Sequence, residues 1–363
     1  MKRFFCFLLL LSMGLQTLLA QNSGQYIKLS ESKYRHSKEY KACNKYQKDA
    51  IIFMDMVADT HPYYVKAERR EEWFALKPAL LEQCKDIQTD EAFVDVLNAV
   101  LGPLHDGHTS LVRKNGQAPE TQEKPGAAGT SNYDYTLFPD QSICYLQFNR
   151  CSDMTGNPFD QFLEEMFARM EEANIQTLVV DAQYNPGGNS RLCSELLLHL
   201  SPADKLKNFT TSIRFSDLLS AQYPRMAQDK KNWESRGHVD ELYQFPPKKV
   251  PEGFRQPKLF EGQVIFVMGR RTFSSAGILM TLARDNHIGT IIGTTSTFSP
   301  SHYGELLFYS LPNTGVRGTV SCKFFARPDA SSVNEPFLKP DVEIDLNEKD
   351  AAWKFICETF GRQ

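Results

Sequence analysis

Apolar residues in the first third of the chain recur with the period of amphipathic helices. They are spaced three and four positions apart in segments 40–64 and 71–84. Segment 89–104 begins with the capping residue Thr89, carries acidic residues in its first turn and ends at a Gly-Pro pair. These patterns predict a small helical domain within residues 21–112.

The pattern changes after residues 113–135. This polar stretch is rich in Gly, Pro and Ala, which predicts a linker. Short apolar runs then alternate with helical periodicity, and the run at 177–184 is typical of a strand buried on both faces. The expected strands are 142–148, 177–184, 263–269 and 288–293, and the expected helices are 157–174, 189–200 and 275–286. In the first of these helices we expect Asn157 as the cap and Pro158 at the first helical position. This order predicts an α/β core over 136–348 with a mostly parallel sheet and right-handed crossovers.

Three further segments complete the expected layout. Residues 304–325 predict an antiparallel hairpin that turns at 312–315, and residues 349–363 predict a C-terminal helix. Segment 201–260 interrupts the alternation of strands and helices. It is either a surface insertion that covers the core or a lid beside a binding site, because long loops in compact domains are often functional.

The first twenty residues form a pattern of their own. Lys2 and Arg3 precede an apolar run that ends at Ala20, where the chain becomes polar. This predicts a signal peptide over 1–20, because the run is too short for a membrane span. We therefore expect an exported, periplasmic or extracellular protein without stable membrane insertion.

Composition narrows the choice of partners. The formal net charge of −3 argues against nucleic acid, which requires a basic surface. Seven cysteines follow the predicted signal peptide and none has CxxC spacing, so no zinc or redox motif is indicated. We expect most of them in the core, with room for one or two disulfides.

Candidate chemistry lies first where strands end. Gly187 and Gly188 follow a predicted buried strand, at the edge of the sheet where ligands bind in open α/β folds. A plain tight turn explains the two glycines equally well. Ser274 and Ser275 stand between a predicted strand and helix, where a serine either caps the helix or acts as a nucleophile beside the helix N-terminus. The G-x-S-x-G elbow is absent.

A nucleophilic serine needs a base. His108 in the sequence HDGHTSL is the best candidate because it lies in a glycine-containing turn and not on an apolar face. His105 and His108 are a weak metal pair with Asp106, since no acidic cluster joins them. His287 and His302 are weaker candidates for the base.

Several ordered motifs resemble those of the C-terminal processing (tail-specific) serine peptidases. They are TLVVDAQYNPGG, VIFVMGRRTFSSAGILMTLARDNHIGTIIG and LKPDVEI, with DGHT at 106–109 upstream. The resemblance spans roughly residues 100–345 and implies a ClpP/crotonase-like core. The DGHT motif is similar to that of the tricorn-core and retinoid-binding-protein-like branch, here without room for a PDZ module.

The resemblance implies roles for particular residues. Ser274 matches the nucleophile and His108 the base, while Gly187, Gly188 and the Ser275 amide match the oxyanion hole. The sequence departs from the family pattern at four positions. Ser299 stands in place of the general-base lysine, and Gly277 in place of the acidic residue after the nucleophile. Gly107 stands in place of the serine before the histidine, and Asn334 in place of the glutamate before the PD motif, with Glu335 one place further along.

The sequence thus predicts an exported serine peptidase that acts on protein or peptide substrates and requires neither metal nor cofactor. Glu335, or else Asn334, would orient His108. The alternatives are a catalytically impaired homologue that binds peptides or an apolar ligand, and a crotonase-like acyl-CoA enzyme. The predicted export signal argues against the acyl-CoA enzyme, because CoA substrates are cytosolic.

Overall fold

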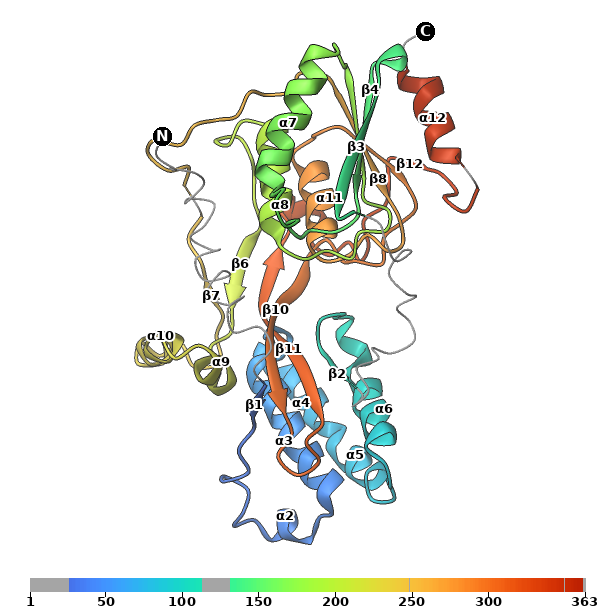
Figure 1. The fold of residues 1–363 in the computed structure, drawn as a ribbon. Coiled ribbons are helices and arrows are strands. Elements are labelled where there is room, and N and C mark those ends of the chain that lie inside the picture. Colours follow the sequence, from blue (N-terminus) through green and yellow to red (C-terminus); the bar gives the residue numbers. More distant parts are fainter. Residues whose placement is uncertain (1–25, 113–130, 248, 349, 362–363) are drawn as a thin grey trace.

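The computed structural model describes residues 26–112, 131–247, 249–348 and 350–361. The predicted signal peptide and most of the predicted linker lie outside these ranges. Figure 1 shows an upper α/β unit and a lower, mainly helical unit, with the long β10–β11 hairpin running from one to the other. Within the described ranges, no helix has the length and apolarity needed to cross a membrane.

The upper unit is built on a six-stranded sheet in the order β12-β9-β8-β5-β4-β3. All neighbouring pairs are parallel except β3–β4, which confirms the predicted mostly parallel α/β core. The strands are β3 (Tyr133–Phe138), β4 (Ile143–Phe148), β5 (Thr177–Asp181), β8 (Gln263–Met268), β9 (Thr290–Gly293) and β12 (Val342–Glu343).

Helices cover both faces of this sheet (Figure 1). Alternate strand residues such as Val180 and Phe266 pack against α7 (Phe159–Glu172), α8 (Ser190–Leu200) and α11 (Ser275–Asp285). The intervening residues, such as Val179, pack against α12 (Ala351–Phe360). Burial on both faces is why the runs Leu178–Val180 in β5 and Val264–Met268 in β8 are continuously apolar.

Helix α7 begins one residue later than its sequence predicts. We expected Asn157 as the cap and Pro158 as the first helical residue, but Pro158 is itself the N-cap and makes no side-chain capping bond. Asp153 Oδ1 instead accepts a hydrogen bond from the Phe159 amide at 3.0 Å. A carboxylate from the preceding loop therefore satisfies an amide at the start of this helix.

A second sheet joins the two units. Its order is β1-β10-β11-β6-β7, with β2 paired to β11. The antiparallel pairing of β10 and β11 confirms the predicted hairpin. These strands are β1 (Ile27–Lys28), β2 (Ser110–Val112), β6 (Thr210–Ile213), β7 (Tyr243–Gln244), β10 (His302–Ser310) and β11 (Arg317–Ala326).

The helical unit holds the tip of this hairpin. Buried Asp49 accepts hydrogen bonds from the backbone amides and side chains of Asn313 and Thr314. The apolar core of the unit includes Phe53, Trp73 and Phe93. Its helices are α2 (Lys38–Ala42), α3 (Lys45–Thr60), α4 (Ala67–Ala75), α5 (Lys77–Gln83), α6 (Asp90–Leu101), α9 (Asp217–Gln222) and α10 (Met226–Glu234).

Segment 201–260 is thus structured throughout much of its length. It contributes α9, α10, β6 and β7, and β6 pairs with β11. Leu218 and Leu219 of α9 are buried in the same core as the N-terminal helices. The middle of the segment therefore extends the lower unit and its sheet, whereas its two ends pack against the α/β core through Leu206, Phe209 and Phe260.

Candidate functional site

Ser274 occupies a strained turn between β8 and α11. Its backbone has φ 51° and ψ −121°, a conformation that side-chain-bearing residues rarely adopt. Such strain costs about 1–3 kcal/mol and is found mostly at functional positions. Although Ser274 is the N-cap residue of α11 by position, its side chain makes no capping hydrogen bond. Helix capping therefore does not explain this serine, and its hydroxyl is available for another partner.

That partner is His108. The Nε2 atom of His108 lies 3.2 Å from Ser274 Oγ, which is hydrogen-bonding distance. The two residues come from different units, because His108 lies in the turn before β2 and Ser274 follows β8. The structure therefore brings together a serine and a histidine that are 166 positions apart in the sequence.

Phe273 helps to place the imidazole. The rings of His108 and Phe273 have centroids 5.2 Å apart. Gly107 makes this approach feasible, since a β-carbon at position 107 would come within 2.8 Å of Phe273 Cζ. The glycine before His108 thus leaves room for the Phe273 ring beside the imidazole.

Behind His108 lies a carboxylate that the sequence did not single out as a partner of the base. Asp106 Oδ1 is 3.4 Å from His108 Nδ1, and it also accepts a hydrogen bond from the His108 amide at 3.0 Å. The other oxygen accepts hydrogen bonds from Thr109 Oγ1 at 2.6 Å and Ser321 Oγ at 2.7 Å. The side chain of Asp106 is only 2% exposed, so these contacts fix its orientation.

His61 is a further partner of this carboxylate and was not predicted. Its Nε2 atom lies 3.2 Å from Asp106 Oδ2, and its Nδ1 atom accepts a hydrogen bond from the Tyr63 amide. An acceptor role for Nδ1 places the proton of a neutral ring on Nε2, where it is donated to Asp106. His61 is fully buried and its ring packs 4.5 Å from that of Tyr303.

These contacts determine the ionisation of Asp106. Burial alone would raise its pKa, but hydrogen bonds from His108 and His61 and the proximity of both rings hold the pKa well below its usual range. Asp106 is therefore a carboxylate at neutral pH. A carboxylate at Nδ1 favours the tautomer of His108 that leaves Nε2 free to accept a proton from Ser274.

Two further histidines named in the sequence analysis, His105 and His302, lie in different surroundings. His105 is exposed and ends a short helical turn in a left-handed conformation, with φ 47°. Among the residues that the structure describes, no three or more His, Cys, Asp or Glu side chains are arranged so that they could hold a metal ion. His302 is buried between Phe298 and Phe325, and burial lowers its pKa to about 3.

The two glycines after β5 lie against the serine turn. A β-carbon on Gly187 would come within 2.7 Å of the Ser274 β-carbon and 2.8 Å of the Ser275 amide nitrogen. The Gly187 amide is already engaged, because it donates to Asn185 Oδ1 at 2.9 Å. In the described part of the chain, neither the Gly188 amide nor the Ser275 amide donates to any acceptor.

Of the three residues expected at the oxyanion hole, Gly187 is the one whose amide already has an acceptor. The amides of Gly188 and Ser275 remain as candidates for an anion site. Gly187 does not offer its N–H group there, but its lack of a side chain lets its backbone pack closely against Ser274. Ser275 Oγ donates to the Gly188 carbonyl at 2.7 Å, which fixes the glycine turn to the start of α11. The positive end of the helix dipole lies at the same place and favours negative charge there.

Glu335 does not lie beside His108 as expected. Its carboxylate pairs with Arg327 Nη1 at 2.5 Å, and Arg327 also pairs with Asp285. Asp285 is the last residue of α11, whereas Ser274 precedes the first. The strong attraction between a buried guanidinium and two carboxylates holds Glu335 at the far end of this helix. Asn334, the other residue expected to orient His108, is exposed.

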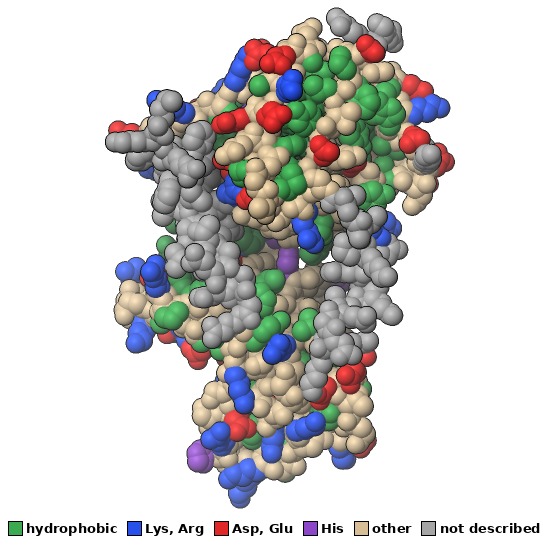
Figure 2. Space-filling view, viewed as in Figure 1, with side chains coloured by type: hydrophobic (Ala, Val, Ile, Leu, Met, Phe, Trp, Pro, Cys, Tyr) green, Lys and Arg blue, Asp and Glu red, His purple; other side chains and the backbone are tan. Residues whose placement is uncertain are grey.

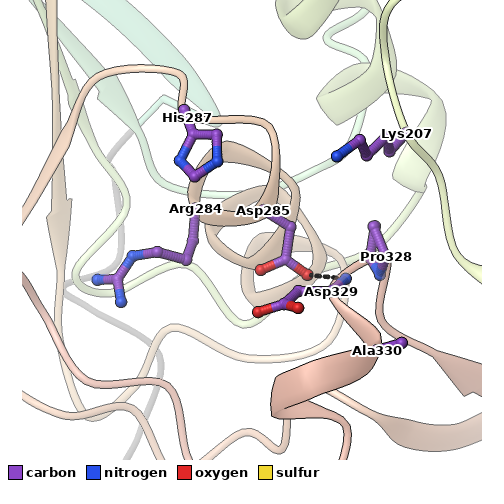
Figure 3. Close-up of a pocket in the computed structure, with 7 residues that line it drawn as sticks. All are labelled: Lys207, Arg284, Asp285, His287, Pro328, Asp329 and Ala330. Carbon is purple, nitrogen blue, oxygen red and sulfur yellow. Dashed lines mark hydrogen bonds between the residues drawn. The ribbon is translucent and has the colours of Figure 1, made fainter.

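A cavity at that far end lies away from the serine turn. Figure 3 shows its lining, which includes Asp285, Asp329, Lys207 and His287. The Asp329 amide donates to Asp285 Oδ2 at 3.0 Å. Figure 2 shows, by contrast, a histidine side chain in the hollow between the upper and lower units, the waist that the hairpin crosses.

With this geometry in place, comparison with known proteins identifies the class. Residues 142–344 match the model of Peptidase family S41. This match covers more than half of the chain, and the protein therefore belongs to that family of peptidases. No curated protein sequence matches the chain significantly.

Solved structures share the fold. A candidate peptidase from Parabacteroides merdae is 18% identical, with a TM-score of 0.57, and the match covers 85% of this chain and 92% of that one. The photosystem II D1 C-terminal processing protease is 12% identical, with a TM-score of 0.50 and coverage of 88% and 98%. A lipoprotein from Streptococcus agalactiae is also 12% identical at a TM-score of 0.50, with coverage of 85% and 95%. At these identities the likeness concerns the fold.

Proposed function

We propose that this protein is an active serine peptidase in which Ser274 is the nucleophile and His108 the general base. The observation that carries this proposal is the 3.2 Å separation of Ser274 Oγ and His108 Nε2 in a strained turn. Membership in a peptidase family supplies the substrate class, namely protein or peptide.

The first chemical step follows from this geometry. His108 Nε2 removes the proton of Ser274 as Oγ attacks the carbonyl carbon of the substrate. The carbonyl bond becomes a C–O⁻ single bond in the tetrahedral intermediate. His108 then gives its proton to the leaving amine, and the C–N bond breaks to leave an acyl-enzyme on Ser274. In the second half of the reaction, His108 removes a proton from water as its oxygen attacks the acyl carbon. The bond to Ser274 Oγ then breaks, His108 returns the proton to the serine, and the carboxylic acid product leaves.

Charge on the carbonyl oxygen would be held by the amides of Gly188 and Ser275. They are candidates because neither donates to an acceptor in the described residues. Ser275 directly follows the nucleophile, and its hydroxyl is hydrogen-bonded to the Gly188 carbonyl. Removal of one such donor in serine peptidases costs about 2.7–4 kcal/mol of transition-state stabilisation. The helix dipole of α11 adds to this preference for an anion.

Asp106 acts through His108 and is therefore a positioning residue. A buried carboxylate at Nδ1 keeps the imidazole in the tautomer that the first step needs, and it stabilises the imidazolium that forms. His108 with Asp106 takes the place of the general-base lysine that the family resemblance implies, because that position holds Ser299. Asp106 also replaces Glu335 in the role that the sequence assigned to it.

We further propose that the peptidase is exported. Support comes from Lys2 and Arg3, the apolar run after them and Ala20 before the polar stretch. Expression in a bacterial host followed by N-terminal sequencing of the periplasmic or secreted fraction tests this. A mature chain that begins at residue 21 is expected, and a cytoplasmic product that retains Met1 would contradict export.

A comparison of cleavage with binding tests the enzymatic proposal. Wild-type, Ser274→Ala and Ser275→Ala proteins are incubated with a library of unstructured peptides, cleavage is followed by mass spectrometry, and binding is followed by fluorescence anisotropy. We expect wild-type cleavage, a loss of at least about 10³-fold in Ser274→Ala, and retained binding. Ser275→Ala should lose only about tenfold, because its amide remains.

Two results would contradict the proposal. Cleavage by Ser274→Ala at the wild-type rate would exclude Ser274 as the nucleophile. Peptide binding without cleavage by the folded wild-type protein would favour the non-catalytic binding homologue.

A further inference from the structure

Two buried thiols lie beneath the Gly187–Gly188 turn. The sulfur atoms of Cys151 and Cys193 are 3.6 Å apart, and each residue is at most 1% exposed. Cys151 follows β4, and Cys193 lies on α8. In the described part of the chain, no other two cysteine sulfurs come within hydrogen-bonding distance of each other.

The pair contacts both halves of the proposed anion site. The Cys151 amide donates to the Gly187 carbonyl at 3.1 Å, and the Asn189 amide donates to the Cys151 carbonyl at 2.7 Å. On the other side, Cys193 Sγ lies 3.2 Å from the Ser275 carbonyl oxygen. The two sulfurs therefore lie between the glycine turn and the first residue of α11.

We propose that Cys151 and Cys193 are a disulfide-forming pair whose bond ties the glycine turn to α8. The sulfur atoms need to approach by only about 1.5 Å to reach the length of a disulfide bond. In the reaction, the two thiols lose two protons and two electrons. A small-molecule disulfide such as oxidised glutathione accepts the electrons and leaves as two thiols, after a mixed disulfide with one of the cysteines.

The surroundings accommodate the oxidised pair. A disulfide has no S–H to donate, so Asn185 Oδ1 and the Ser275 carbonyl each lose a sulfur contact. Asn185 Oδ1 keeps the Gly187 amide as a donor. The Ser275 carbonyl lies in the first turn of α11, where the amide four residues later supplies the regular helical bond. Asn185 Oδ1 and the Ser275 carbonyl therefore each keep one hydrogen-bond donor.

The bond would also restrict the unfolded chain. Cys151 and Cys193 are 42 positions apart, so the disulfide closes a long loop and its contribution to stability is substantial. For a chain of this size we expect an upward shift in Tm of about 5 °C in the oxidised protein. Burial of the thiols means that oxidation must occur during folding or during local opening, when thiolates can form.

Peptide mapping after refolding tests the proposal. The full chain is refolded in a glutathione redox buffer and, separately, in dithiothreitol. Free thiols are alkylated under denaturing conditions, and digested peptides are identified by mass spectrometry. The expected result is a linked pair of peptides that contain Cys151 and Cys193 in the oxidised sample alone, with the higher Tm. Cys144→Ser, a buried control without a neighbouring sulfur, should keep the link, and Cys151→Ser should lose it.

Alkylation of both Cys151 and Cys193 after oxidative refolding to the native circular dichroism spectrum would overturn the proposal. A disulfide between either cysteine and another residue would overturn it as well. The readout does not depend on peptidase activity, so an inactive enzyme would leave the disulfide test intact.

Discussion

Gly187 packs so closely on Ser274 that a β-carbon at position 187 would lie 2.7 Å from the β-carbon of the serine. Gly187 also has a φ of 94°, which side chains other than that of glycine strain to adopt. Position 187 thus combines a backbone requirement with a steric one. Both act on the turn that we propose to hold the nucleophile.

Gly187→Ala should therefore displace the serine turn and reduce kcat by at least about 100-fold, because small shifts of reacting atoms are costly. Gly156→Ala is the matched control, since Gly156 has a φ of 79° but no atom lies within 4 Å of the place that an added β-carbon would take. It should cost about 1 kcal/mol of stability and leave kcat unchanged. Steady-state kinetics with urea unfolding of both variants makes the comparison, and equal kcat values would contradict the steric argument.

Asp106→Asn should reduce kcat by roughly 10²–10⁴-fold, because an amide no longer selects the productive tautomer of His108. The substrate KM should change little, since Asp106 acts through the base. Ser321→Ala removes a different hydrogen bond to the same carboxylate and should reduce kcat by less than about tenfold. Equal losses in both variants would show that Asp106 serves only the packing of this region.

Glu335→Gln should leave kcat within about threefold of the wild-type value. Its carboxylate pairs with Arg327, so the expected effect is a loss of about 0.5–1.5 kcal/mol in the free energy of unfolding. Kinetics and chemical denaturation measure the two effects separately. A 100-fold loss of kcat with unchanged stability would return Glu335 to the role of orienting His108.

His302 should make the protein sensitive to acid. Burial lowers its pKa to about 3, whereas the unfolded value is about 6.5, so only the unfolded chain takes up a proton between these values. Stability from His302 is therefore complete above about pH 6.5 and is lost as the pH falls towards 3. His302→Phe, which keeps an aromatic ring between Phe298 and Phe325, should reduce this loss.

Urea unfolding at pH 7 and pH 5 measures the difference. Between these values the wild-type protein should lose about 2 kcal/mol more than His302→Phe. His36→Phe, at an exposed position, is the control and should follow the wild type. Identical pH dependence in wild type and His302→Phe would contradict the buried, neutral state of His302.

The parts of the fold that depend on local sequence could be predicted. The apolar runs that became β5 and β8, and the helical periodicity of α11, are each visible within a short stretch of the chain. Because β8 and α11 are consecutive, they place Ser274 at a strand-to-helix turn without tertiary information. The β10–β11 hairpin could be predicted for the same reason, because Pro312 to Gly315 is a turn sequence between two strand-like runs.

The surroundings of the base depend on distant residues and could not be predicted in the same way. Asp106 is fixed by Ser321, which is 215 positions away, and by His61, which is 45 positions away. The sequence did hold one signal, since Asp106 stands two positions before His108. A carboxylate so close to a candidate base merits consideration as its partner as well as a metal ligand.

The glutamate was misplaced for a related reason. Its position after Asn334 fits the motif with a shift of one residue, but Arg327, which also pairs with Asp285, draws its carboxylate away from His108. The sequence left open which glycine amide is free, and the Gly187 amide is engaged because Asn185 Oδ1, two residues earlier, accepts its hydrogen bond. In both cases a specific polar partner decided the outcome, and residue spacing gives little information about such partners.

Covalent labelling with a fluorophosphonate tests the central claim most directly. The folded wild-type protein and the Ser274→Ala and His108→Ala variants are treated with the reagent, and the modified residue is located by mass spectrometry of peptides. The expected result is one adduct on Ser274 of the wild type, none in Ser274→Ala, and strongly slowed labelling in His108→Ala. An unlabelled wild-type protein with native circular dichroism, or an adduct on Ser275 instead, would contradict Ser274 as an activated nucleophile.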